Sequence, residues 1–197
     1  MDHPERIHAA RLGFEGPHEI GNWRPLVNWL LAIPQLLIVS ALRAVRQVLL
    51  LIAFFAVLFT KKIPEPLYDF IVMTLRYRWR VVSYALWMRE SYPPFDFAPT
   101  SEDPGNDPAS VAITRPEELV RWLPLVKWFL AIPHYIVLTF IWIGAVFVGI
   151  AAFFAVLFTG RYPEAMRDYL VGTNRWFLRV LAYAGFLRDE YPPFSLS

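Results

Sequence analysis

The amino-acid sequence predicts an all-α membrane protein built from two tandem pseudo-repeats. Three observations lead to this prediction. Hydrophobic residues make up 56% of the chain and charged residues 18%, whereas soluble domains are about 45–50% apolar and about 25% charged. Aromatic residues reach 17%, an excess typical of proteins that meet a membrane interface. The apolar octamer AFFAVLFT also occurs twice, at Ala53–Thr60 and at Ala152–Thr159.

A shift of 99 residues aligns the two copies without a gap. Between positions 23 and 95, 32 of 73 residues are identical to their counterparts in the second copy. The chain therefore divides into a first repeat over 1–95, a polar linker over 96–110 and a second repeat over 111–197. The linker is rich in Pro, Ser, Asp and Gly, which predicts a solvated loop between the repeats.

Each repeat is expected to begin with a short extended segment. His8–Phe14 and Ser110–Thr114 alternate apolar and polar residues, which is the pattern of a strand. A long apolar run follows, over 25–60 in the first repeat and over 123–159 in the second. About 20 apolar residues suffice to cross a bilayer as one helix. Each run is thus too long for one simple crossing and barely long enough for two.

Two arrangements of the apolar run remain open. In one, the start of the run lies along the interface and a single helix crosses from Pro34 or Pro133 onward. In the other, the run folds as a tight helical hairpin. Arg43 and Arg46 favour the hairpin, because each would cost roughly 2.5–3.5 kcal/mol in the middle of a single crossing. Ala41–Leu49 opposes the hairpin, since it holds only good helix formers and no turn residue.

The distribution of basic residues also favours the hairpin. Lys and Arg are concentrated in 61–90 and in 160–190. If both segments are cytoplasmic, as the positive-inside rule prefers, each repeat crosses the membrane an even number of times.

An amphipathic helix is predicted after each apolar run, over 64–90 and over 163–189. On a helical projection, one polar stripe spans about 100° and is repeated in both copies. In the first copy its members are Glu65, Asp69, Arg76, Arg80 and Tyr84.

Three interpretations of this stripe are open. The helices lie at the membrane interface with their apolar face in lipid. Alternatively, the arginines pair with carboxylates of the same or the other copy. As a functional alternative, the stripes contact anionic lipid headgroups or a protein partner, because arginine binds phosphate in a bidentate fashion. The candidate contact residues are Arg76, Arg80, Arg175, Arg179, Tyr84 and Tyr183.

Tryptophans stand at the entrance of each apolar run, where interfacial anchoring is the expected role. These residues are Trp23, Trp29, Trp122 and Trp128. The motif Tyr-Pro-Pro-Phe ends each repeat and stops the amphipathic helix. We expect it to fold back onto its own domain; a docking surface for a partner is the alternative.

The sequence offers no recognisable catalytic machinery. There are no cysteines, and no histidine has a second ligand at metal-binding spacing. His134, within the second apolar run, is interpreted as a polar interfacial or packing residue rather than a metal or haem ligand. No phosphate-binding or nucleophile-elbow motif is present. We therefore expect a protein that is not an enzyme and has no cofactor and no metal. A net charge of +2 argues against nucleic acid as a partner.

Three segments carry a resemblance to a known family. Leu125–His134 (LVKWFLAIPH), Leu157–Pro163 (LFTGRYP) and the closing YPPF resemble the bacterial membrane family called domain of unknown function 4389. The resemblance covers nearly all of both copies, although the first copy departs from it at Leu58–Pro64 (LFTKKIP). It implies a membrane protein but says little about activity, and no catalytic residues are carried over from it.

The leading function predicted is a non-enzymatic accessory or scaffold subunit of a larger membrane complex, with respiratory and photosynthetic assemblies as candidates. Its expected partners are the lipid bilayer, other membrane subunits and anionic phospholipids. A lipid-binding or lipid-handling module is the alternative, and a transporter built from repeats is a weaker one. The expected location is the bacterial inner membrane, with the basic segments and the linker in the cytoplasm.

Overall fold

The computed structural model describes residues 9–196, and most of these are helical. The elements follow in the order β1 (Ala10–Phe14), α1 (Arg24–Thr60), α2 (Glu65–Ala85), β2 (Ala109–Ile113), α3 (Pro124–Leu130), α4 (Ile132–Thr159) and α5 (Glu164–Ala184). The first copy contributes β1, α1 and α2, and the second contributes the rest. The predicted repeats and their short extended segments are therefore present, with β1 described from Ala10 and His8 lying outside the described residues.

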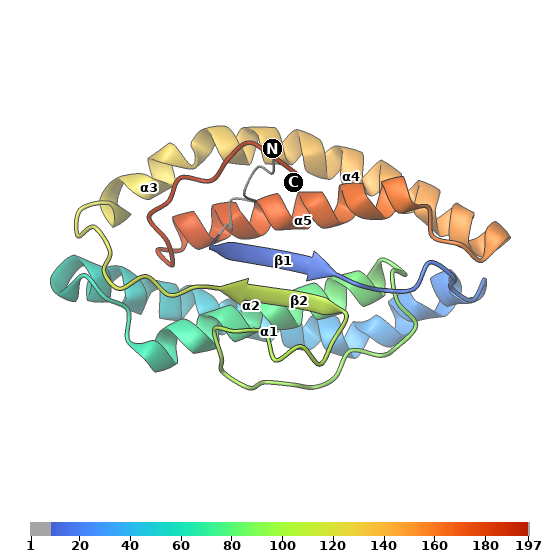
Figure 1. The fold of residues 1–197 in the computed structure, drawn as a ribbon, viewed down its shortest axis with the longest axis horizontal. Coiled ribbons are helices and arrows are strands. Elements are labelled where there is room, and N and C mark those ends of the chain that lie inside the picture. The colour runs from blue at the N-terminus through green and yellow to red at the C-terminus, as the bar shows by residue number, and fades with distance from the viewer. Residues whose placement is uncertain (1–8, 197) are drawn as a thin grey trace, which may run out of the picture.

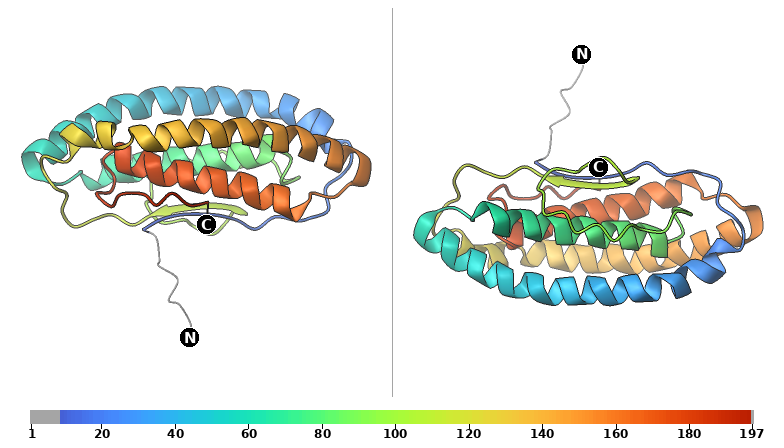
Figure 2. Two further views of the ribbon diagram at one scale, coloured as in Figure 1. Left: turned by 90° about the horizontal axis from the view of Figure 1, so that it is seen from above. Right: turned by 90° about the horizontal axis from the view of Figure 1, so that it is seen from below.

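The elements are arranged in three layers (Figure 1, Figure 2). The long apolar helices α1 and α4 form one outer layer, side by side and running in opposite directions. Helices α2 and α5 form the middle layer. The two-stranded sheet and the segment that leads into β2 cover the opposite side.

The expected alternative of a helical hairpin in each apolar run is wrong. Helix α1 continues unbroken for 37 residues, because Ala41–Leu49 has no residue that favours a turn. Arg46 is accommodated by turning inward, where its Nη1 donates to Thr74 Oγ1 of α2 at 3.3 Å. In the second copy, α3 and α4 are separated only at Ala131, two residues before Pro133.

The ends of the long helices match in the two copies. Lys61 and Gly160 are equivalent positions, and both adopt the left-handed conformation with φ of 61° and 65°. This conformation ends a helix, and glycine adopts it without the cost that a side chain brings. The turn then leads into α2 or α5, each of which begins directly after a proline.

The strands are exchanged between the copies. β1 pairs antiparallel with β2, with Leu12 opposite Val111. β1 belongs to the first copy but packs on α5 of the second, whereas β2 packs on α2 of the first. A second pair of contacts repeats this exchange at the helix turns, where Ile20 N donates to Gly160 O and Leu119 N to Lys61 O. Each copy is therefore completed by the other.

The amphipathic helices are the most enclosed elements, which corrects the expectation that they lie at the membrane interface. In α2, buried residues run almost without interruption from Ile71 to Val81. One side of the helix packs against α1 and another against β2. Apolar residues retained in both long helices complete this core from outside, including Ala53, Val57, Ala152 and Val156. The apolar side of the amphipathic helices thus meets protein rather than lipid.

Candidate functional site

The arginine stripe of α2 is covered by the segment that leads into β2. Arg80 Nη1 lies 2.9 Å from Asp96 Oδ2, and its Nη2 donates to Asn106 Oδ1 at 2.8 Å. Arg76 donates from Nη1 to Thr100 Oγ1 at 3.0 Å. Both arginines are buried. The interpretation in which these arginines pair with carboxylates is therefore the one that the geometry supports, and the carboxylates belong to the linker rather than to either copy.

Asp107 is the most enclosed carboxylate of this segment, with a side chain 2% exposed. Its Oδ2 accepts from Arg89 Nη2 at 2.9 Å, and its Oδ1 lies 3.9 Å from Arg80 Nε. The backbone amide of Ala98 and the Arg80 guanidinium hold the pKa of Asp96 below its usual range. The linker predicted over 96–110 is thus exposed on its outer side, as its composition indicates, but its three aspartates turn inward onto the arginines of α2.

The equivalent arginines of α5 have different surroundings. Arg175 donates from Nε to the carbonyl of Leu12 in β1 at 3.1 Å. Arg179 is 7% exposed, and its Nε and Nη1 have no hydrogen-bond partner among the described residues. Burial lowers the pKa of Arg179, and the neighbouring Arg175 lowers it further, against a smaller opposing effect of Glu190. No described carboxylate forms an ion pair with either arginine.

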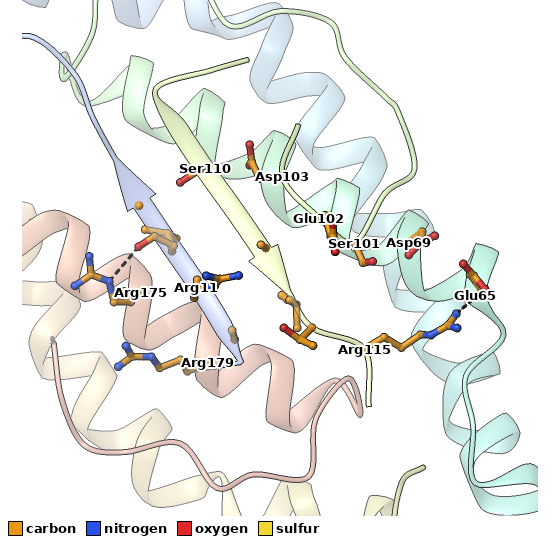
Figure 3. Close-up of a pocket in the computed structure, with 16 residues that line it drawn as sticks. Arg11, Glu65, Asp69, Ser101, Glu102, Asp103, Ser110, Arg115, Arg175 and Arg179 are labelled. Carbon is orange, nitrogen blue, oxygen red and sulfur yellow. Dashed lines mark hydrogen bonds and ion pairs between the residues drawn. The ribbon is translucent and has the colours of Figure 1, made fainter. Parts of the chain in front are cut away.

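These α5 arginines line an open groove of about 1110 Å³ that extends over the sheet (Figure 3). Its lining is divided by charge. At the end near α5 lie Arg11, Arg175 and Arg179, whereas the end near α2 carries Asp69, Glu102 and Asp103. Farther along, Arg115 Nη1 forms an ion pair with Glu65 Oε2 at 3.1 Å. The groove therefore has an arginine-rich half and an acidic half.

The two tyrosines expected to contact headgroups or a partner are buried. Tyr84 packs edge to face against Tyr92 with ring centroids 5.4 Å apart. Tyr183 makes the same contact with Tyr191 at 5.5 Å. Both partner rings belong to the Tyr-Pro-Pro-Phe motifs, so the motifs fold back onto their own repeats as expected. Tyr84 and Tyr183 are structural supports in this arrangement.

The four tryptophans expected at the membrane interface are each more than half exposed. They stand near the starts of α1 and α3, at the edge of a large apolar face. That face runs along α1, α3 and α4. Helices α1 and α4 are each long and apolar enough to cross a membrane. The exposed side chains of the face include Leu37, Val48, Phe59, Phe129, Phe140, Phe147 and Phe158.

Several polar residues that were not expected from the sequence form hydrogen bonds and ion pairs between the apolar helices and the segments that follow the middle-layer helices. Lys127 is fully buried and lies 2.7 Å from Asp189 Oδ1. Its counterpart Asn28 donates to the carbonyl of Arg89 at 3.2 Å. Seven residues further on, Gln35 donates to the carbonyl of Pro93 at 3.0 Å. The signal was a polar residue at the same two positions, seven apart, in both copies.

His134 occupies the place of Gln35 in the second copy. Its ring stacks on Phe194 with centroids 4.0 Å apart, and its Nδ1 accepts from Trp176 Nε1 at 3.2 Å. It is a packing residue in this structure, as expected. Within residues 9–196, no group of three or more His, Cys, Asp or Glu side chains is placed to hold a metal ion.

Comparison with known proteins finds one family. The family model described as Domain of unknown function (DUF4389) matches the chain twice, over residues 22–96 and 122–195. No curated protein and no solved structure matches the chain. The two matches cover well over half of the sequence and coincide with the two repeats, and the chain therefore belongs to this family of unknown function as a tandem pair of its domains.

Proposed function

We propose that the protein is a non-enzymatic accessory or scaffold subunit that is anchored in a membrane by its apolar layer. The observation that carries this proposal is the division of the molecule into two unlike faces. Large apolar side chains are exposed along the whole of α1, α3 and α4. The charged groove is lined by residues of both strands, and the sheet and the acidic linker lie on the side away from that layer (Figure 2).

The apolar layer lies flat in one leaflet in this proposal. Helix α1 has 37 residues and is therefore about 55 Å long, whereas the hydrocarbon core is about 30 Å thick. If α1 crossed the membrane, the buried arginines of α2, which packs along it, would enter the hydrocarbon region too. Lying flat, α1 places the exposed Arg43 at headgroup depth, where a guanidinium remains hydrated. The sheet face then projects into water, free to meet other proteins.

The positions of the arginines argue against the lipid-handling alternative. Arg76 and Arg80 are buried and bound to the linker. Arg175 and Arg179 line the groove on the sheet side, turned away from the layer that would contact lipid. The transporter alternative needs charges paired within the membrane, and Arg46 instead donates to a threonine hydroxyl.

The scaffold proposal is tested by purifying the full chain from its native membrane in a gentle detergent. Native mass spectrometry of the purified material should show at least one further protein in a fixed stoichiometric ratio. A monomer that carries only phospholipids would contradict the scaffold role and favour lipid handling. As a control, washing at high ionic strength removes proteins held only by non-specific surface charge.

A further inference from the structure

Equivalent arginines have different surroundings in the two copies. On α2 and just after it, acidic residues of the linker form ion pairs with Arg76, Arg80 and Arg89, although Nε of Arg76 and Nε of Arg80 have no hydrogen-bond partner among the described residues. On α5, Arg175 is bound to backbone carbonyls, and Arg179 keeps Nε and Nη1 without a partner among the described residues. A buried guanidinium with unpaired N–H groups is costly. This asymmetry indicates that the α5 surface is completed by something outside residues 9–196.

The first copy shows how such a surface is recognised. The linker runs along the outer edge of β2, where Ser101 O accepts from Ile113 N at 3.2 Å. Asp103 Oδ2 accepts from Val111 N at 2.7 Å and lies 3.8 Å from Arg76 Nε. One extended segment therefore uses two contacts at once, a strand edge and an arginine stripe.

The second copy presents the same two features. β1 corresponds to β2, and its Leu12, opposite Val111 in the sheet, directs its carbonyl outward to Arg175. Arg179 lies beside Arg175 in the groove, and Arg11 adds a third guanidinium at this end (Figure 3). The groove is open, so an extended chain has access to both the strand edge and the arginines.

We propose that the arginine-rich half of this groove binds an extended acidic segment of a partner protein, whose carboxylates reach Arg179 and Arg175 as Asp96 and Asp103 reach Arg80 and Arg76. Binding to an open strand edge supplies backbone hydrogen bonds, and the side-chain contacts supply specificity. The acidic half of the groove repels further carboxylates and fixes which end of the segment carries them. The inference rests on the proposed scaffold function and names the chemistry of its partner.

The linker itself supplies the probe. A fluorescent peptide with the sequence of residues 96–108, DFAPTSEDPGNDP, is titrated with the purified full chain in detergent, and anisotropy is recorded. The peptide should bind the unaltered protein. A doubly substituted protein, R175Q/R179Q, should bind at least tenfold more weakly. The matched control R121Q/R161Q removes two exposed arginines outside the groove and should bind as the unaltered protein does.

A change on the peptide keeps the test independent of protein folding. A peptide with Asn in place of its aspartates at 96, 103 and 107 should also bind at least tenfold more weakly. Failure of the acidic peptide to bind, or equal binding by R175Q/R179Q, overturns the inference. Binding that is seen only after Asp2→Asn and Glu5→Gln substitution overturns it as well, because the chain then supplies its own carboxylates.

Two further outcomes separate this inference from its alternatives. If the acidic peptide does not bind, but phosphatidylglycerol vesicles do and R175Q/R179Q weakens their binding, the groove is a lipid site and the inference fails. If a stoichiometric partner copurifies equally with the unaltered protein and with R175Q/R179Q, the scaffold function stands and this groove is not its docking site. If the peptide binds as expected but no partner copurifies, the inferred chemistry stands and the scaffold function fails.

Discussion

Asp107 holds two buried guanidinium groups with one carboxylate. Its side chain is 2% exposed, and those of Arg80 and Arg89 are 1% and 3% exposed. Removing the charge of one member of a buried set leaves the others desolvated and uncompensated. The local arrangement of the linker thus depends on this residue more than on its many exposed neighbours.

The substitution Asp107→Asn is therefore expected to destabilise the protein by about 3–5 kcal/mol, the cost typical of breaking a buried ion pair from one side. Thermal unfolding in detergent, followed by circular dichroism, measures the loss. Glu190→Gln is the matched control, since Glu190 is 60% exposed and lies 3.7 Å from Arg188. An exposed pair of this kind contributes about 0–1 kcal/mol. Equal melting temperatures for the two variants would contradict the proposed role of Asp107.

The elements themselves were partly predictable. The repeated octamer and the 99-residue shift gave two equivalent units, and alternation predicted both strands. Helix propensity over Ala41–Leu49 was a better guide to α1 than the presence of Arg43 and Arg46. A charge in an apolar run has more than one solution: Arg46 turned inward to Thr74, and Arg43 stayed on the exposed side of the helix.

The surroundings of each element were harder to predict. A helical projection shows that Arg76 and Arg80 share one side of a helix, but not whether that side meets water, headgroups or a carboxylate. The deciding signal lay elsewhere in the chain, in Asp96, Asp103 and Asp107. The exchange of β1 and β2 between copies could not be predicted from the sequence either, because a strand pattern carries no information about which helix the strand will cover.

The linker is expected to loosen from α2 in acid. The pKa of Asp96 lies below its ordinary value of 3.8 in the folded protein, chiefly through the Ala98 amide and next through Arg80. The released segment therefore binds protons more readily than the docked one. Docking is fully stabilised by this group above about pH 4 and loses that contribution as the pH falls through the lowered pKa.

Pulse-labelling hydrogen exchange at pH 6 and at pH 3, with intrinsic rates corrected for pH, measures this effect. Amides of 98–111 should lose protection at the lower pH. The amides of β1 are the internal control, since no described carboxylate ties Arg175 or Arg179 to that strand. Equal protection factors for 98–111 at both values would contradict the assignment.

At the scale of the whole molecule, the proposed flat arrangement bears on the number of membrane crossings. The positive-inside argument required an even number of crossings per repeat, and a protein lying in one leaflet makes none. Both ends of α1 and the linker then face the same compartment. A crossing helix would instead expose its two ends on opposite sides.

Single cysteines test this arrangement directly, because the chain has none of its own. Glu19, Lys62 and Glu102 are exposed positions before α1, after α1 and in the linker. In sealed, oriented vesicles, the variants E19C, K62C and E102C should all react with a membrane-impermeant maleimide from the same side. If E19C and K62C react from opposite sides, α1 crosses the membrane. Detergent-permeabilised vesicles, in which all three variants should react, are the control.

The exchange of strands has a consequence for how such a molecule can be assembled. Consider a polypeptide with only one strand, one apolar helix and one amphipathic helix. Its strand would have no helix of the other copy to pack on, and its arginine-bearing helix would not be covered by a strand. Two identical polypeptides of this kind could satisfy each other by trading strands, giving a symmetric homodimer with the outline of the present chain. In a single chain, the loop that joins the two copies is present only once, so the two arginine-bearing surfaces are no longer equivalent. The surface of α2 can then bind the loop, while the surface of α5 can bind a different segment.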